Sequence, residues 1–423
     1  MRILILSWEF PPESVGGLSQ HVFELSRSLV NLGCQVEVVT AGNGNLPDNE
    51  KMDGVEVFRV IPYQGSEGLG FIDWVHRLNF ALLEKAASLC RERGKYDLIH
   101  AHDWLVAFAA RALKHIYTIP MLATIHATEY GRNSGIHNEQ QRYISDIEWS
   151  LTFEAWKVIC CSEYMRREVK NIFQIPDDKI SIIPNGIRPD AYETQGVDLS
   201  QVLSPLPEKM VFYVGRMVQE KGIQVMLEAA PEILKRFPQA KFVIAGKGPF
   251  EQDLHRRTQE KGIQDSVIFL GFIDDATRNE LYRAASAAVF PSLYEPFGIV
   301  ALEAMICGAP VVVTSVGGFD EIVKHEVDGL KAAPADPHSL TEQISRLLEG
   351  GNFAASLAEN AYQKARRQYS WDNIAEQTSK IYEEIIFSPK NTQWQQKSVH
   401  IGQSRDEVEV ERRKKDPQIP DLV

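Results

Sequence analysis

Short apolar runs alternate along this chain with longer segments whose apolar residues recur every three or four positions. Residues 3–6 form the first apolar run, and residues 18–32 form the first segment with helical spacing. The apolar positions that define this helix are Val22, Leu25, Leu29 and Leu32. Gly33 ends the helix, and residues 36–39 form the next apolar run. This alternation predicts parallel strands connected by helices, which is the pattern of an α/β protein.

The same alternation continues through both halves of the chain. Further strands of the first half are predicted at residues 55–60, 98–100, 121–125, 158–161 and 180–183, with helices at 76–93 and 108–115. In the second half, strands are predicted at 210–214, 241–245, 267–270, 287–290 and 310–313, with helices near 222–236, 251–261, 277–285, 298–307 and 340–349. Residues 188–209 contain several prolines and little apolar periodicity, so they are the predicted linker.

Two doubly wound domains separated by a cleft follow from this pattern. The first domain covers residues 1–190 and the second covers residues 205–370. Ligands of such domains bind at the carboxyl ends of the strands, so the cleft is the predicted site. Residues 388–423 contain glutamines, mixed charges and few apolar residues, which predicts a mobile charged tail.

Composition excludes several classes of function. The chain has 423 residues and a formal net charge of −12, which makes a nucleic acid an improbable partner. Five cysteines without C-x-x-C spacing indicate reduced thiols and a cytoplasmic protein. The N-terminal apolar run is too short for a signal peptide. Since no apolar run approaches the roughly 18 residues of a membrane span, we expect no integral membrane association.

A pair of carboxylates around a Pro-Phe-Gly break carries the strongest chemical information. Glu295 follows a predicted strand, and Glu303 lies about one turn inside the helix that Gly298 opens. Helical side chains lean toward the N-terminus of their helix, so Glu303 is expected to point back toward the loop of Glu295. The N–H groups at the start of that helix favour an anion. Hydroxyl-binding carboxylates beside an anion site suit a sugar linked to a diphosphate, whereas the alternative is an exposed helix residue and a turn former.

This run resembles the Glu-x7-Glu signature of the family-4 retaining glycosyltransferases. Other segments in the same order along the chain support the resemblance: Gly16-Gly17, Pro184-Asn185-Gly-Ile, Gly215-Arg216, Lys221-Gly222 and Gly246-Lys-Gly-Pro. The match covers roughly residues 1–387. It implies the GT-B architecture, in which two Rossmann-like domains face each other across a cleft. It also implies that a helix at 371–387 packs back on the first domain.

The resemblance assigns roles on the donor side of the cleft. It implies that His126 binds the 6-hydroxyl of the donor sugar and Glu295 its 3-hydroxyl, while Arg216 and Lys221 neutralise the leaving nucleoside diphosphate. The donor-binding residues that it implies are Gly16, Gly17, Asn185, Ile273, Phe297, Gly298, Ile299, Val300 and Glu303. The lysine that bacterial glycogen synthases carry two positions before the Gly-Gly pair is replaced here by Ser14. This departure weakens the match to that subgroup.

The run His102-Asp103-Trp104 is similar to a segment that glycogen and starch synthases carry after the corresponding strand. The similarity places Asp103 and Trp104 on the acceptor side. Asp103 is alternatively a helix N-cap. Trp104 either offers a sugar-stacking surface or belongs to the core.

Together these features predict a retaining glucosyltransferase that uses a nucleotide sugar, ADP- or UDP-glucose, as its co-substrate. The predicted acceptor is the non-reducing end of an α-1,4-glucan. No Asp-x-Asp motif occurs, so neither a metal nor another cofactor is expected. One alternative is a family-4 transferase that acts on a lipid or small-molecule acceptor. The other is a non-catalytic module that binds a nucleotide sugar or a glucan.

Overall fold

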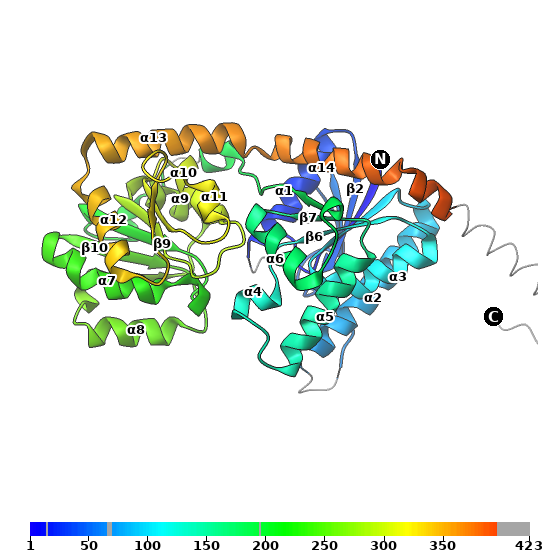
Figure 1. Cartoon of the computed structure of the whole chain (residues 1–423), viewed down its shortest axis with the longest axis horizontal. Helices are drawn as coiled ribbons and strands as arrows, with labels where there is room; N and C mark the ends of the chain where they lie inside the picture. Colours follow the sequence, from blue (N-terminus) through cyan, green and yellow to red (C-terminus); the bar gives the residue numbers. More distant parts are fainter. Residues whose placement is uncertain (14–15, 66–69, 194–195, 396–423) are drawn as a thin grey trace, which may run out of the picture.

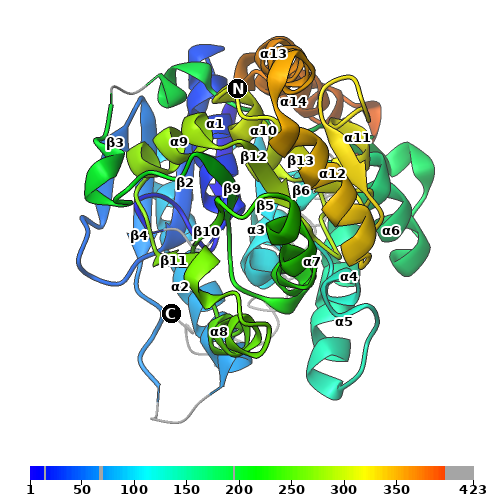
Figure 2. The same cartoon turned by 90° about the vertical axis from the view of Figure 1, so that its left-hand side faces the viewer.

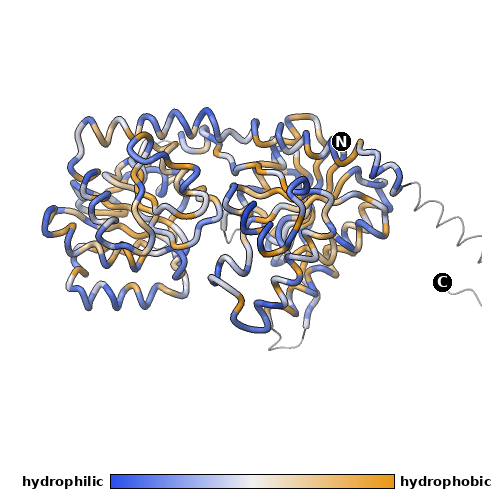
Figure 3. The backbone as a smooth tube through the Cα atoms, in the orientation of Figure 1, coloured by the Kyte–Doolittle hydropathy of each residue, from blue (hydrophilic) through white to orange (hydrophobic). Residues whose placement is uncertain are grey.

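Two α/β domains make up the computed structural model, which describes residues 1–13, 16–65, 70–193 and 196–395 (Figure 1). Apolar residues concentrate inside each domain, and polar residues cover the outside (Figure 3). Two sheets, parallel except for one edge strand and flanked by helices, confirm the predicted fold class. Among the described residues, none of the helices combines the length and apolar content that crossing a bilayer requires.

The sheet of the first domain has eight strands in the order β3-β4-β2-β1-β5-β6-β7-β8. These strands are β1 (Arg2–Leu6), β2 (Gln35–Ala41), β3 (Asn49–Met52), β4 (Val55–Val60), β5 (Leu98–His102), β6 (Met121–Ile125), β7 (Lys157–Cys160) and β8 (Ile180–Ile182). Only the pairing of β3 with β4 is antiparallel within this sheet. The apolar residues of β1 are completely buried, as expected for a central strand covered on both faces.

Helices connect these strands and cover both faces of the sheet (Figures 1 and 2). They are α1 (Gly17–Asn31), α2 (Phe71–Arg93), α3 (Ala107–Tyr117), α4 (Glu129–Asn133), α5 (Glu139–Glu154) and α6 (Glu163–Phe173). Helix α2 begins five residues earlier than the apolar periodicity indicates, and Gly70 occupies its N-cap position. The earlier start brings Phe71 into the helix.

The sheet of the second domain has six parallel strands in the order β11-β10-β9-β12-β13-β14. These strands are β9 (Lys209–Val214), β10 (Ala240–Ala245), β11 (Val267–Gly271), β12 (Ala287–Phe290), β13 (Val311–Thr314) and β14 (Leu330–Ala332). The helices are α7 (Ile223–Arg236), α8 (Glu251–Glu260), α9 (Asp275–Ala284), α10 (Ile299–Ile306), α11 (Phe319–Ile322), α12 (Pro337–Glu349) and α13 (Gly351–Gln368). The sequence pattern missed β14, α11 and α13, of which the first two have only three and four residues.

Helix α14 (Trp371–Ile386) returns to the first domain after α13 has run along the second. The two helices follow one another along one edge of the molecule (Figures 1 and 2). Helix α14 packs beside α1, and the hydroxyl of Tyr382 lies 2.7 Å from Nδ1 of the buried His100. The backbone N–H of Ile187 donates to the carbonyl of Tyr369 over 2.6 Å, so both crossings between the domains lie side by side.

The charged tail predicted from residue 388 begins later than expected. Residues 389–395 continue as helix, and the side chain of Asn391 is buried. The ring centroids of Trp156 and Trp394 lie 5.7 Å apart, which attaches this segment to the first domain. The burial of Asn391 and the ring contact of Trp394 were not predictable from the polar composition of this segment. The rest of the predicted tail, residues 396–423, lies outside the described residues.

Candidate active site

A cavity of about 420 Å³ lies between the two domains at the carboxyl ends of the central strands. Most of the predicted site residues line it. They are Gly16, Gly17, Asp103, Trp104, His126, Asn185, Arg216, Lys221, Glu295, Phe297, Gly298, Ile299 and Val300. Because these residues come from six separate segments of the chain, the fold alone brings them together, as open α/β sheets do at their strand ends.

An ion pair joins the turn that contains Lys221 to the loop that contains Glu295. The ammonium of Lys221 lies 2.7 Å from a carboxylate oxygen of Glu295, and both side chains are largely buried. Ser292 donates a second hydrogen bond to the same oxygen over 3.2 Å. Lys221 is therefore held in place by Glu295 at the wall of the cavity.

The turn that carries Lys221 requires a glycine immediately after it. Gly222 has a φ of +69°, and a Cβ atom there would lie 1.8 Å from the carbonyl oxygen of Pro291. Lys221 and the loop that leads to Glu295 consequently pack backbone against backbone. Arg216, from the loop after β9, also lines the cavity and lies 3.5 Å from Glu220.

Helix α10 presents its N-terminus to the cavity. Gly298, Ile299 and Val300 line the wall, and no side chain caps the helix through a hydrogen bond. Gly298 has a φ of +106°, and a Cβ atom there would overlap the ring of Phe319 at 2.2 Å. Backbone N–H groups at such a helix end bind anions such as a diphosphate.

The first-domain counterpart at Gly16-Gly17 is arranged differently. Helix α1 begins at Gly17, and the carboxylate of Glu9 accepts a hydrogen bond from the N–H of Ser19 over 3.2 Å. The carboxylate of Glu9 therefore already binds one of the backbone N–H groups at the start of α1. The sequence pattern gave no indication that Glu9 would reach it.

Asp103 and His126 lie together on the first-domain wall, at the ends of the neighbouring strands β5 and β6. The carboxylate of Asp103 accepts the backbone N–H of His126 over 2.8 Å. Asp103 has a φ of +59°, which is uncommon for a residue with a side chain. Burial raises the pKa of Asp103 to about 6. Burial lowers the pKa of His126 to about 3, and the nearby charge of Arg132 contributes to this shift. His126 is therefore neutral and acts as a hydrogen-bonding group.

Three histidines form the cluster of potential metal ligands found among the described residues. They are His21, His102 and His126, with possible ligand atoms within 4.8 Å of one another. Nδ1 of His21 lies 2.7 Å from the amide oxygen of Asn185, and Nδ1 of His102 lies 3.1 Å from Nε2 of His126. One nitrogen of each ring is thus already engaged by a neighbouring side chain.

Two predicted donor residues do not line the cavity. Glu303 accepts a hydrogen bond from the hydroxyl of Tyr192 over 3.1 Å, and Arg278 lies 3.7 Å from the same carboxylate oxygen. Ile273 is partly buried in the loop after β11 and also lies outside the cavity wall. Their contact with a donor remains a prediction.

A polar bridge that the sequence did not indicate connects the strand end of His126 with the loop of Glu295. Glu168 of α6 accepts hydrogen bonds from Thr128 over 2.6 Å and from the hydroxyl of Tyr294 over 2.9 Å. Thr128 follows His126 by two residues, and Tyr294 directly precedes Glu295. This bridge fixes the distance between the two walls of the cavity.

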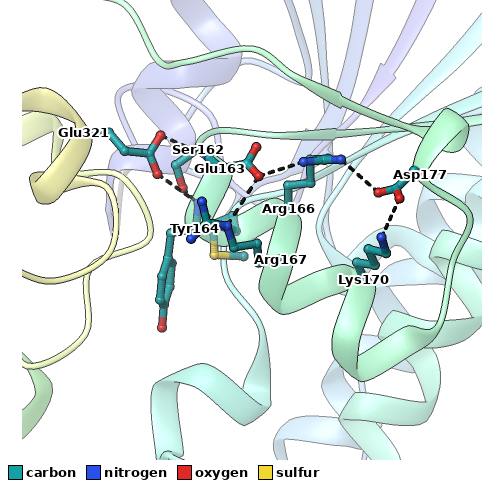
Figure 4. Close-up of polar contacts among 9 residues, drawn as sticks. Ser162, Glu163, Tyr164, Arg166, Arg167, Lys170, Asp177 and Glu321 are labelled. Carbon is teal, nitrogen blue, oxygen red and sulfur yellow. Dashed lines mark hydrogen bonds and ion pairs between the residues drawn. The ribbon is translucent and has the colours of Figure 1, made fainter.

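The N-terminus of α6 adds a second set of contacts between the domains. Glu321 of the second domain accepts the backbone N–H groups of Glu163 and Tyr164 over 3.0 and 2.9 Å (Figure 4). The hydroxyl of Ser162 donates to the carbonyl of Pro296 over 2.6 Å. The loop of Glu295 is therefore attached to the first domain on both sides.

Two Rossmann-like domains that enclose cationic side chains and an uncapped helix N-terminus define a glycosyltransferase of the GT-B type. The family profile "Glycosyltransferase Family 4" matches residues 15–191, and "Glycosyl transferases group 1" matches residues 197–364. The chain belongs to glycosyltransferase family 4 and resembles the glycogen and starch synthases within it.

Individual proteins support this assignment over nearly the whole chain. An uncharacterized glycosyltransferase of Methanocaldococcus jannaschii is 39% identical, over 90% of this chain and 98% of the relative. A glycogen synthase of Mycobacterium tuberculosis is 33% identical, over 90% of this chain and 94% of the relative. The structure of sucrose-phosphate synthase from Thermosynechococcus elongatus superimposes with a TM-score of 0.78 at 26% identity, over 90% of this chain and 98% of that chain.

Proposed function

We propose that this glycosyltransferase moves a glucosyl unit from ADP- or UDP-glucose to the non-reducing end of an α-1,4-glucan, with retention of configuration and without a metal ion. The 33% identity to a glycogen synthase supports the choice of sugar and acceptor. The observation that carries the proposal is the presence of Arg216, Lys221 and the start of α10 together on the second-domain wall of the cavity.

The second-domain wall is suited to a leaving diphosphate. Arg216, Lys221 and the start of α10 all border the cavity, and a preorganised cation there stabilises the negative charge that develops as the nucleotide departs. Lys221 is already oriented by Glu295, so it need not reorganise during the reaction. We assign to these groups the role that a divalent cation has in metal-dependent transferases.

The first-domain wall is suited to a neutral acceptor. Three carboxyl groups, Glu9, Asp103 and Glu129, line it beside a single arginine, Arg132. Carboxylates bind sugar hydroxyl groups, whereas they repel a phosphorylated acceptor. A glucan end satisfies this requirement, and a phosphorylated small molecule does not.

Retention fits attack from the face that the leaving group vacates. The bond between C1 of the donor sugar and the phosphate oxygen breaks, and the acceptor oxygen forms a bond to the same face of C1. The acceptor proton moves to the departing phosphate oxygen. Neutral His126 and the carboxylate of Glu295 orient the sugar by hydrogen bonds, and neither residue is consumed in a covalent step.

A screen of nucleotide sugars against maltooligosaccharides, glycolipid precursors and small sugars tests the proposal. Extension of maltooligosaccharides by glucose is the expected result. Activity restricted to a lipid or small-molecule acceptor would overturn the glucan assignment, and co-sedimentation with vesicles would then identify a membrane acceptor. Absence of both transfer and donor hydrolysis would favour a binding module without catalysis.

A further inference from the structure

A cluster of four aromatic rings borders the active-site cavity, and three of them, Trp8, Phe71 and Trp104, line it. The rings of Phe71 and Trp74 lie parallel within 11°, with centroids 6.0 Å apart. Phe71 meets the edge of Trp104 with centroids 6.0 Å apart, and Trp8 meets Trp74 in the same way at 6.5 Å. Edge-to-face and offset parallel arrangements hold such rings firmly in place.

Phe71 is the member of this cluster that offers an open surface. Its side chain is 49% exposed although it borders the cavity, whereas Trp104 is 3% exposed. Trp104 therefore belongs to the core. The exposed ring that could stack on a sugar is Phe71. An exposed phenyl ring supported from behind by a tryptophan costs little conformational entropy when it binds a partner.

The surroundings of the ring identify the chemistry of its ligand. Sugars have apolar faces of C–H groups and rims of hydroxyl groups, so they suit an aromatic surface next to carboxylates. Glu9, Asp103 and Glu129 line the same wall and provide hydrogen-bond acceptors. Phe71 belongs to helix α2 of the first domain, whereas the buried pair of Lys221 and Glu295 belongs to the second domain.

We propose that Phe71, supported by Trp74, binds a glucosyl unit of the acceptor some distance from the reacting end, and so makes the enzyme selective for oligosaccharides over single sugars. This inference rests on the proposed glucan acceptor. It adds a subsite at which the length of the acceptor contributes to affinity.

Tryptophan fluorescence measures this binding without requiring catalysis, since none of the seven tryptophans lies between residues 157 and 370. Maltoheptaose and glucose are titrated into the wild type, Phe71→Ala, Phe71→Tyr and Phe80→Ala. Phe80 is 64% exposed on the same helix and does not line the cavity, so it is the matched control. Loss of the contact is expected to weaken maltoheptaose binding about tenfold in Phe71→Ala. Phe71→Tyr and the control are expected to bind as the wild type does, and the affinity for glucose is expected to change far less.

Equal affinity of Phe71→Ala and the wild type for maltoheptaose would overturn the inference, and so would a wild type that binds no maltooligosaccharide. A variant that loses affinity for decyl phosphate micelles instead of maltoheptaose would show that the surface receives an acyl chain, which also overturns it. If the expected binding pattern is found but no glucose is transferred to maltoheptaose, the aromatic subsite stands and the proposed reaction fails.

Discussion

The buried histidines make the stability of the first domain depend on pH, and His100 allows the effect to be isolated. This side chain is completely buried, with its two nitrogens 2.7 Å from the hydroxyl groups of Tyr382 and Thr124. Burial lowers the pKa of His100 well below its usual value, and the neighbouring His21 and His126 contribute to this shift. The folded chain therefore excludes a proton that the unfolded chain accepts below a pH of about 6.5.

The sign and size of the effect follow from this difference in protonation. Above pH 6.5 both states are neutral at His100, and the residue stabilises the fold through its hydrogen bonds. As the pH falls below 6.5, protonation of the unfolded chain removes stability, which amounts to about 2 kcal/mol at pH 5. Asp103 acts in the opposite direction because its folded pKa is raised, so the total slope of stability with pH is mixed. The difference between wild type and variant separates His100 from these other groups.

The experiment compares the wild type with His100→Gln by urea unfolding at pH 8 and pH 5. Tryptophan fluorescence reports on the first domain and the helix that packs on it, because all tryptophans lie there. At pH 8 the variant is expected to lose about 1–3 kcal/mol through its hydrogen bonds. At pH 5 the deficit is expected to shrink by about 2 kcal/mol. The exposed His137→Gln is the control, with no change in deficit expected. A deficit for His100→Gln that is equal or larger at pH 5 would show that His100 does not cause this loss of stability.

Three further predictions concern catalysis. Lys221→Ala is expected to lower kcat roughly 10²–10³-fold because the leaving charge is no longer neutralised; near-normal turnover, matching the exposed control Lys235→Ala, would assign Lys221 a structural role only. Turnover is expected to persist in EDTA, and a loss that magnesium or manganese restores would contradict the proposed metal independence. Tyr294→Phe and Glu168→Gln are each expected to lower kcat/KM roughly fivefold while the thermal midpoint changes little, since one hydrogen bond between the cavity walls is lost. If kcat/KM of the double variant falls by the product of the two single effects, the two residues act separately.

The order of most strands was predictable because burial imposes periodic apolar positions, whereas the helices α5, α6 and α13 were missed. The placement of Lys221 and Glu295 in one site was anticipated, since the carboxyl ends of neighbouring parallel strands meet at one edge, but their ion pair was not. The resemblance of the motifs to those of the family-4 glycosyltransferases also supported this prediction. Short elements such as β14 and α11 were missed because three or four residues contain too little periodicity.

Polar contacts between distant segments were not predictable from spacing. Glu321 and the start of α6 are about 158 positions apart, and nothing in either segment indicates the other. For Glu303, the position in the chain was predicted but the hydrogen-bond partner was not. Its position on the helix was anticipated, but the linker residue Tyr192 binds its carboxylate. Such pairings depend on how the domains dock, which the local sequence pattern does not encode.

The anomeric configuration of the product distinguishes retaining transfer to a glucan from the other reactions. Maltoheptaose is incubated with ADP-glucose and UDP-glucose, and the extended chain is examined by proton NMR. We predict an added α-1,4-linked glucose at the non-reducing end, formed with EDTA present. A β-linked product, or no extension with either donor, would contradict retaining transfer to a glucan.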